Sequence, residues 1–594
     1  MENLLEFLHG DGAEKFKEAK KLANIEAKND PENDPFRSRY KERELLQEIH
    51  STVTKKTEEL GLENEKDVKI ILCSLEYKLG INYLDTEETP TAEDKFTKCL
   101  DVVEEYKFEP SASALYLSVL NQLGILWANR RKPDRALSFL QQGEEHYHKY
   151  KDEKDGSPLM IEELFIKTEE EDVEKLENKR AWAFEETYTH TLYYLAQVYG
   201  SLDESRKSAE YCQMTLSRQL DTMKYDPIDW AVNAAALSQY YITQNIFPLA
   251  RHCLASADFI IQEAKPPESS ETSPSDTATV DEKERLPKAK ADINRCWSKY
   301  ALALLDVSAG KLMEEINDDE GVSENGATSN KEDEREKADA NILFNLELTI
   351  HENQITDQYV KDFEEARKVF LCIQRWLNSA KEFYMLDSHC VDYVEIIQDM
   401  SKAYKLLAFY ETDFDRQCKM HKRRIDMLDV VLKALNPQFY LLICRQLMYE
   451  MAETYSAMLD LKYAIIEETG NPPSSHAVKK INTLAEQSIM QYKDYINSLK
   501  DSNQKMPKKL SDEDERPALV AHFCIGRLYS KFLEFDPQKK IALIQKSIDY
   551  YKFLVDYCKD NPSSESKVKE EFRICEEMVA LLPTKMERLR LQME

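Results

Sequence analysis

Two consecutive stretches of the chain, YTHTLYYLAQVYGSLDESRKSAEYCQMTL (residues 188–216) and WAVNAAALSQYYITQNIFPLARHCLASADFII (residues 230–261), share one pattern. In each, large apolar residues recur at the three- and four-residue spacing that places them on one face of a helix. A short polar break divides each stretch into two such segments. Each stretch is therefore predicted to form a hairpin of two antiparallel helices.

The second stretch fits the tetratricopeptide template, in which large and small residues alternate at fixed positions. With Ser238 at position 8, the residues at positions 7, 11, 20, 24 and 27 are Leu237, Tyr241, Ala250, Leu254 and Ala257. Small residues let the two helices approach closely, and large residues fill the groove beside them. The first stretch fits less completely, with Leu195, Ala196 and Tyr199 at positions 7, 8 and 11.

The same template recurs along the chain. Two earlier windows match it without a gap: Leu79, Gly80, Tyr83, Ala92, Phe96 and Cys99, and then Leu123, Gly124, Trp127, Ala136, Leu140 and Gly143. Partial copies carry Ala452, Tyr455 and Ala464, and then Gly526 with Tyr529. Repeats of this kind stack into a solenoid, so the predicted fold is all-α. An acidic insertion, from Asp152 to about Lys179, accounts for the wide spacing between the second and third hairpins.

Composition divides the chain into three regions. Residues 1–263 are predicted to form an N-terminal solenoid and residues 341–594 a C-terminal one. Between them, residues 264–340 contain two polar segments, which we expect to be disordered because they hold too little apolar surface to fold. A helix at residues 293–316 separates these segments and is interpreted as a linker between the two solenoids.

The formal net charge of −30 limits the partners of the 594-residue chain. Nucleic acids and anionic membranes both select basic surfaces, so neither is an expected partner. No signal peptide and no apolar run of membrane-spanning length is recognised, which predicts a soluble intracellular protein without membrane insertion. A protein with a basic face is the natural complement.

Signatures of catalysis are missing from the sequence. There is no phosphate-binding loop, no GxGxxG, no GxSxG and no HExxH, and thirteen glycines could hardly build nucleotide-binding loops. The twelve cysteines lack the spacing of zinc ligands or of a disulfide framework, and His146 and His148 point to different faces of a helix. We therefore predict a protein that is not an enzyme and holds no cofactor or metal.

Surfaces remain as candidate sites. Position 9 of a repeat faces the concave groove, and here it holds Gln197 and Gln239. Tyr193 or Tyr194 lies beside the first, and Gln219 could border the same groove. The Lys and Asn of the chaperone-binding carboxylate clamp are absent from these positions, which argues against a co-chaperone.

The basic run KMHKRR (residues 419–424) is a secondary candidate, through Lys419, Lys422, Arg423 and Arg424. It could be a localisation signal or a phosphate-binding site. It lies within the apolar periodicity of Cys418, Ile425, Leu428 and Leu432, so its simplest interpretation is the polar face of a helix.

Several segments belong to no general repeat consensus. They are DPFRSRY (34–40), YTHTLYYLAQVYGSL (188–202), ARHCLASA (250–257), CKMHKRRIDML (418–428), LNPQFYLL (435–442), YKFLVDYC (551–558) and LLPTKMERLR (581–590). In these segments the chain resembles the kinesin-binding proteins of animals, and the resemblance extends over nearly its whole length. It implies a tetratricopeptide-like, right-handed helical solenoid in two halves joined by a linker helix.

The resemblance also implies a function. Members of this family bind the motor domains of certain kinesins with the concave face of the solenoid and block microtubule attachment. The matching positions here are Tyr194, Gln197, Gln219 and Ser238 or Gln239; the vertebrate Thr of the fourth hairpin is replaced by Ala236. The expected protein is a cytoplasmic, cytoskeleton-associated monomer that regulates microtubule-based transport. The alternative is a cargo adaptor that binds kinesin tails or light chains, linked to organelle transport such as that of mitochondria.

Overall fold

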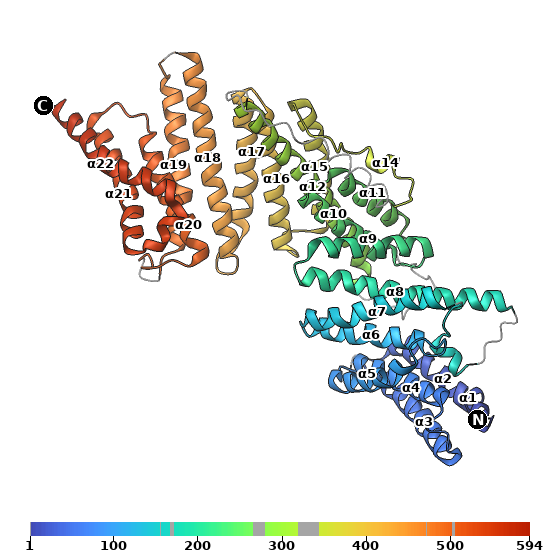
Figure 1. Ribbon diagram of the computed structural model, residues 1–594. Coiled ribbons are helices and arrows are strands. Elements are labelled where there is room, and N and C mark those ends of the chain that lie inside the picture. Colours follow the sequence, from blue (N-terminus) through green and yellow to red (C-terminus); the bar gives the residue numbers. More distant parts are fainter. Residues whose placement is uncertain are drawn as a thin grey trace. The chain divides into compact units, whose positions relative to one another are not determined.

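A computed structural model describes residues 2–31, 33–154, 156–166, 172–264, 280–318, 344–470, 472–501 and 505–593. The chain divides into two compact units, residues 1–240 and 241–594, and each unit is described by itself. In both units the described secondary structure is helical (Figure 1). The prediction of an all-α fold is confirmed.

The first unit is a series of helices that follow one another along the chain. Its α-helices are α1 (Glu2–His9), α2 (Asp11–Lys21), α3 (Arg37–Leu60), α4 (Lys66–Asp85), α5 (Thr89–Val103), α6 (Ser113–Asn129), α7 (Pro133–Glu153), α8 (Val173–Ser201), α9 (Ser205–Thr222) and α10 (Pro227–Thr243), whose last turn passes the unit boundary. Four shorter turns are η1 (Leu22–Glu26), η2 (Ala27–Asn29), η3 (Glu104–Tyr106) and η4 (Ile161–Leu164). The pairs α4–α5, α6–α7 and α8–α9 are in extensive contact, as the hairpin prediction requires.

Close approach within these hairpins depends on glycine. A Cβ atom on Gly80 would lie 2.6 Å from Cε1 of Phe96, and one on Gly124 would lie 2.7 Å from Cγ of Leu140. These are the position-8 and position-24 residues of the template, so the two windows pair in space as their spacing predicts. Phe96 and Leu140 have no exposed surface, because they fill the space that the glycines leave.

The insertion between the second and third hairpins is shorter than expected. Helix α8 begins at Val173 rather than after Lys179, because the Asp172 carboxylate accepts hydrogen bonds from the backbone amides of Glu174 and Lys175 and so caps the helix. Before it, Phe165 is fully buried and stacks on Phe16, with ring centroids 4.5 Å apart. Part of the acidic insertion is therefore tied to the N-terminal helices of the unit.

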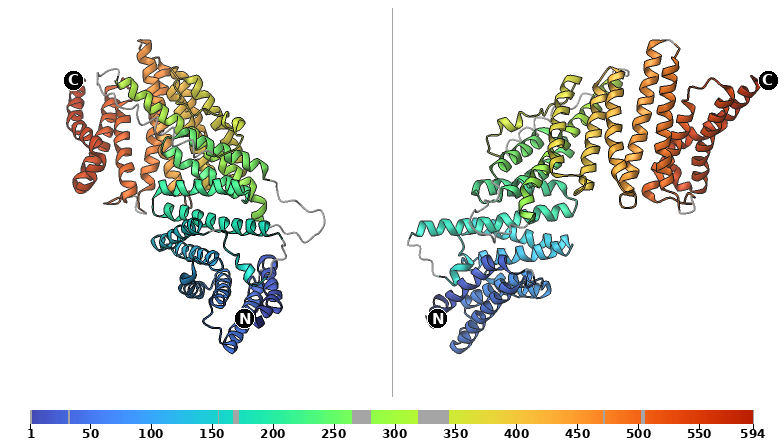
Figure 2. Two further views of the ribbon diagram at one scale, coloured as in Figure 1. Left: turned by 45° about the vertical axis from the view of Figure 1, so that its right-hand side comes forward. Right: turned by 180° about the vertical axis from the view of Figure 1, so that it is seen from behind.

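The second unit continues the hairpin pattern with longer helices (Figure 2). Its elements are α11 (Phe247–Glu263), α12 (Val280–Asp318), α14 (Thr349–Glu352), α15 (Phe363–Phe383), α16 (Cys390–Tyr410), α17 (Phe414–Ala434), α18 (Leu441–Thr469), α19 (Ser475–Ser498), α20 (Asp512–Ser530), α21 (Pro537–Asp560), η5 (Pro562–Val568) and α22 (Lys569–Leu591). Each of the helices from α15 to α22 contacts the next helix in the chain. Side-chain caps begin many of them, for example Asp362, Asp413 and Ser511.

The expected linker helix is α12, and it is packed into the second unit. It contacts α15 and α16, and its fully buried Trp297 stacks on Trp376, with ring centroids 5.1 Å apart. The helix begins at Val280, so its first turns occupy part of the segment expected to be disordered. Most of the two polar segments, residues 265–279 and 319–343, lie outside the described residues, and the proposed domain boundaries remain a prediction.

Candidate protein-binding site

A hollow of about 150 Å³ lies on the first unit where α8, α9 and α10 meet. Among its lining residues, Tyr193 and Gln197 come from α8, Gln219 from the end of α9 and Asn233 from α10. The structure thus brings together two of the predicted site residues, Gln197 and Gln219, which are separated by one inter-helix turn.

Small residues line this hollow, and their hydroxyl groups are hydrogen-bonded within the protein. The Ser208 hydroxyl donates a hydrogen bond to the Ala196 carbonyl, with an O···O distance of 2.8 Å. The Thr215 hydroxyl donates to the carbonyl of Tyr211, also at 2.8 Å. Because these hydroxyls are already hydrogen-bonded, the walls give a bound partner only a surface to pack against. Hydrogen bonds to a partner would come from the side-chain amides at the hollow.

Gln197 and Gln219 supply that capacity. Gln197 is exposed and Gln219 is half-buried. Within the described part of the chain, neither side-chain amide has a hydrogen-bonding partner, whereas the backbone carbonyls of both accept bonds from nearby hydroxyls. An amide carries two donors and an acceptor. The pair can therefore bond to polar groups of a partner in either direction.

The two adjacent tyrosines are divided between the hollow and the core. Tyr193 lines the hollow, whereas Tyr194 packs against the cluster that contains Leu117, Leu140 and Leu192. Their rings meet edge to face, with centroids 5.2 Å apart. Burial raises the pKa of Tyr194 above its usual value. Tyr194 thus supports the position of Tyr193 and is itself only partly available to a partner.

Ser238 and Gln239, the two alternatives for a contact residue on α10, differ in how far they are buried. Ser238 has no exposed surface, and its hydroxyl donates to the Ala235 carbonyl at 2.6 Å. Gln239 is half-buried, and its amide donates to the Ser238 hydroxyl at 3.1 Å. Of the two, only Gln239 presents surface to a partner, and neither lines the hollow.

The basic run on α17 does not form one polar face. Lys419, Lys422 and Arg423 are exposed, but Arg424 is 4% exposed. Its guanidinium donates to the Ser401 hydroxyl at 3.0 Å and lies 3.3 Å from a carboxylate oxygen of Glu450. The interpretation of Arg424 as part of the polar face of the helix is wrong, because its guanidinium is buried against Ser401 of α16 and Glu450 of α18.

Asn233 was not singled out from the sequence, although it lines the hollow. The signal that could have identified it is its place as the one polar residue in the run WAVNAAAL (230–237). A polar side chain within such an apolar run is rarely buried without a partner. Its half-exposed position beside Gln219 follows from that rule.

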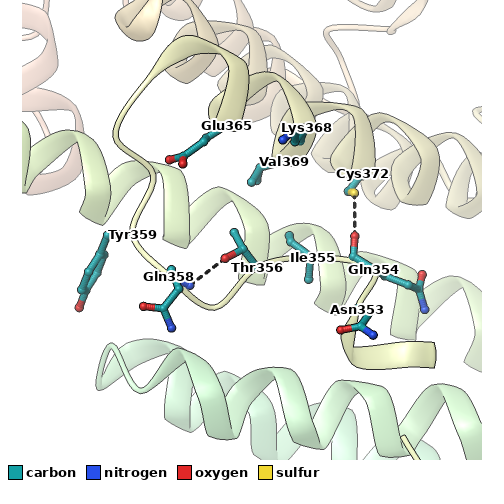
Figure 3. Close-up of a pocket in the computed structure, with 10 residues that line it drawn as sticks. All are labelled: Asn353, Gln354, Ile355, Thr356, Gln358, Tyr359, Glu365, Lys368, Val369 and Cys372. Carbon is teal, nitrogen blue, oxygen red and sulfur yellow. Dashed lines mark hydrogen bonds between the residues drawn. The ribbon is translucent and has the colours of Figure 1, made fainter. Parts of the chain in front are cut away.

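A second hollow, of about 310 Å³, lies in the second unit beside α15 (Figure 3). Several of its polar groups are already used within the protein. The Cys372 thiol donates to the backbone carbonyl of Gln354 at 3.3 Å, the backbone N–H of Gln358 donates to the Thr356 hydroxyl at 3.0 Å, and the Glu365 carboxylate accepts from the backbone N–H of Lys361. These groups are therefore not free to bind a ligand.

The described residues contain no cluster of three or more His, Cys, Asp or Glu side chains arranged to hold a metal ion. Among the same residues, no helix has both the length and the apolar character needed to cross a membrane. The described structure is that of a helical-repeat protein with a small hollow bordered by two glutamine amides.

Comparison with known proteins identifies the family to which the chain belongs. A family model described as "KIF-1 binding protein C terminal" matches residues 228–589. The "KIF-binding protein" of Gallus gallus is 41% identical over 97% of both chains, that of Homo sapiens 38% over 98% of both, and that of Drosophila melanogaster 31% over 98% of this chain and 97% of its own. These names describe binding proteins and no catalyst.

Solved structures agree with the sequence relatives. A structure titled "Kinesin binding protein (KBP)" is 34% identical, with a TM-score of 0.64 over 96% of this chain and 98% of that one. Another, titled "Cryo-EM map of KIFBP", is 32% identical, with a TM-score of 0.65 over 98% of both chains. The chain belongs to the KIF-binding protein family.

Proposed function

We propose that this protein binds kinesin motor domains through the hollow formed by α8, α9 and α10 and inhibits their attachment to microtubules. The observation that carries the proposal is the pair of glutamine amides, Gln197 and Gln219, which face one hollow without partners in the described chain. Membership of a family whose relatives are named for kinesin binding supplies the class of partner.

The charge of the chain supports competition with the microtubule. A motor domain must present a basic face to the acidic surface of tubulin, and a chain with a net charge of −30 attracts the same face. Long-range attraction of this kind accelerates encounter more than it deepens affinity. The amide-lined hollow would then supply the short-range contacts that hold the motor in place.

Inhibition in this proposal needs no chemical step. A motor domain whose microtubule-binding face is covered cannot dock on its track, so the effect should follow the stoichiometry of the complex. Regulation of microtubule-based transport would follow, at the cytoskeleton and in the cytoplasm, from the fraction of motors that is covered.

The test is microtubule co-pelleting of isolated kinesin motor domains, without tails, at low and moderate salt. Excess of this protein should leave the motors in the supernatant, and its binding should weaken as salt screens the attraction. Motor pelleting that is unchanged by excess protein would refute the inhibitor proposal. Capture of full-length kinesin but not of the isolated motor domain would instead identify a cargo adaptor.

A further inference from the structure

The second unit contains a much larger groove, of about 1170 Å³, lined chiefly by alternate helices of its stack: α16, α18 and α20. Small-molecule sites commonly span roughly 300–1,000 Å³ and are largely enclosed. A groove of this size that runs across three helices instead suits a segment of polypeptide. It is formed wholly within the second unit and shares no residue with the hollow proposed above for the motor.

One face of α18 forms the length of the groove. Leu442, Gln446, Tyr449 and Glu453 follow one another at helical spacing along it. Eleven residues separate the first from the last, which corresponds to about 16 Å at 1.5 Å per residue. This is the length of about three helical turns in a bound segment.

Most of the charges in the groove are neutralised in pairs. Lys402 and Asp306 are 3.0 Å apart, Arg424 and Glu450 are 3.3 Å apart, and Arg445 and Asp514 are also 3.3 Å apart. These pairs fix the walls of the groove. They leave its net charge to the side chains that remain unpaired.

Those unpaired side chains are mainly acidic. Asp399, Glu453 and Glu513 line the groove without an ion pair or side-chain hydrogen bond among the described residues, against a single unpaired ammonium, Lys405. The surrounding protein removes part of the hydration of two of the carboxylates, and so raises the pKa of Asp399 and of Glu453. A cation brought by a partner would restore the stabilisation that hydration no longer supplies.

An exposed leucine, Leu442, lines the groove at the N-terminal end of α18, beside the paired Arg445 and Asp514. Leu442 is 65% exposed, and Phe439, which lies in the turn before α18 and outside the lining of the groove, is 79% exposed. Large apolar side chains that remain exposed together commonly mark an interaction surface. The α18 face of the groove therefore carries an exposed leucine at one end and a carboxylate, Glu453, at the other.

We propose that this groove binds a helical segment of a partner protein that carries lysine or arginine over Asp399 and Glu453 and apolar residues over Leu442. The unpaired carboxylates of the groove select the basic residues, and contact with Leu442 fixes the direction in which the segment lies. The groove acts as a second docking surface that does not depend on the hollow between α8 and α10.

Fluorescence anisotropy with the full chain tests this proposal. The probe is a labelled synthetic peptide of about 14 residues with leucines on one helical face and lysines beside them; a second peptide replaces the lysines with glutamates. We expect the lysine peptide to bind and the glutamate peptide not to bind. Failure of the lysine peptide to bind at low salt would overturn the proposal.

Matched variants separate the groove from the general charge of the chain. Asp399→Asn with Glu453→Gln should weaken binding of the lysine peptide about tenfold, as expected for partly desolvated charges. Glu382→Gln with Asp556→Asn removes the same charge from exposed positions outside the groove and should change affinity by less than about twofold, because exposed charges are screened. Equal effects of the two pairs, in variants with unchanged circular dichroism, would refute the groove as the site.

Discussion

Removal of the two glutamine amides at the hollow is the most direct test of the proposed motor site. In Gln197→Ala with Gln219→Ala, the fold loses no hydrogen bond between described side chains, so the free energy of unfolding should change by no more than about 0.5 kcal/mol per site. Each amide can make at least one hydrogen bond with a partner, worth about 1 kcal/mol net. Loss of both should cost about 2 kcal/mol, or roughly a 30-fold rise in Kd.

Titration of an isolated kinesin motor domain measures this Kd. Gln142→Ala is the matched control, because its exposed amide bonds only to Ser138 on its own helix. Tyr194→Ala is a less specific probe, since its ring packs against the core of the unit and its loss would change stability as well as contact. If the folded double variant binds the motor as tightly as the unchanged protein, the hollow is not the site, and Lys419, Lys422 and Arg423 become the next residues to test.

Three further predictions concern stability. Gly80→Ala should lower the free energy of unfolding by about 1 kcal/mol, because overpacking against Phe96 (~1–3 kcal/mol) exceeds the gain in helix propensity (~1 kcal/mol). In urea denaturation, the double variant with Phe96→Leu should lose less stability than the sum of the two single variants. Strict additivity would contradict the contact between these residues. Arg424→Met should lower the free energy of unfolding by about 3 kcal/mol, because it leaves the carboxylate of Glu450 without its cation. Arg423→Met, at an exposed position, should change it by no more than about 0.5 kcal/mol, and similar values for both variants would show that burial is not the cause. Burial lowers the pKa of His522 to about 4, so between pH 6.5 and 4 the unfolded state binds a proton that the folded state excludes. The free energy of unfolding should therefore decrease as the pH is lowered through this range, by up to about 1.4 kcal/mol per pH unit. In denaturation series across pH, His522→Phe should make this decrease shallower, and an unchanged slope would contradict the prediction.

The site shows where prediction from sequence stops. The position of Gln197 and Gln219 at one hollow could be predicted, because the repeat template assigns a direction to each position of a helix. The separation of Tyr193 from Tyr194 could not be predicted, because both directions are compatible with one helical period. Only the packing of Tyr194 against the residues of α6 and α7 decides between them.

The sequence by itself determined the all-α class, the hairpin pairing and the family. The class and the pairing depend on spacings within single hairpins, such as the small residue Gly80 and the large residue Phe96 sixteen positions later, which meet in space. The family was recognised from segments outside the repeat consensus. The tertiary structure alone decided which polar groups are buried. Arg424 is enclosed by Ser401 and Glu450, which lie 23 and 26 residues away on other helices. The burial of a side chain depends on such neighbours on other helices, and the periodicity of its own helix carries no information about them.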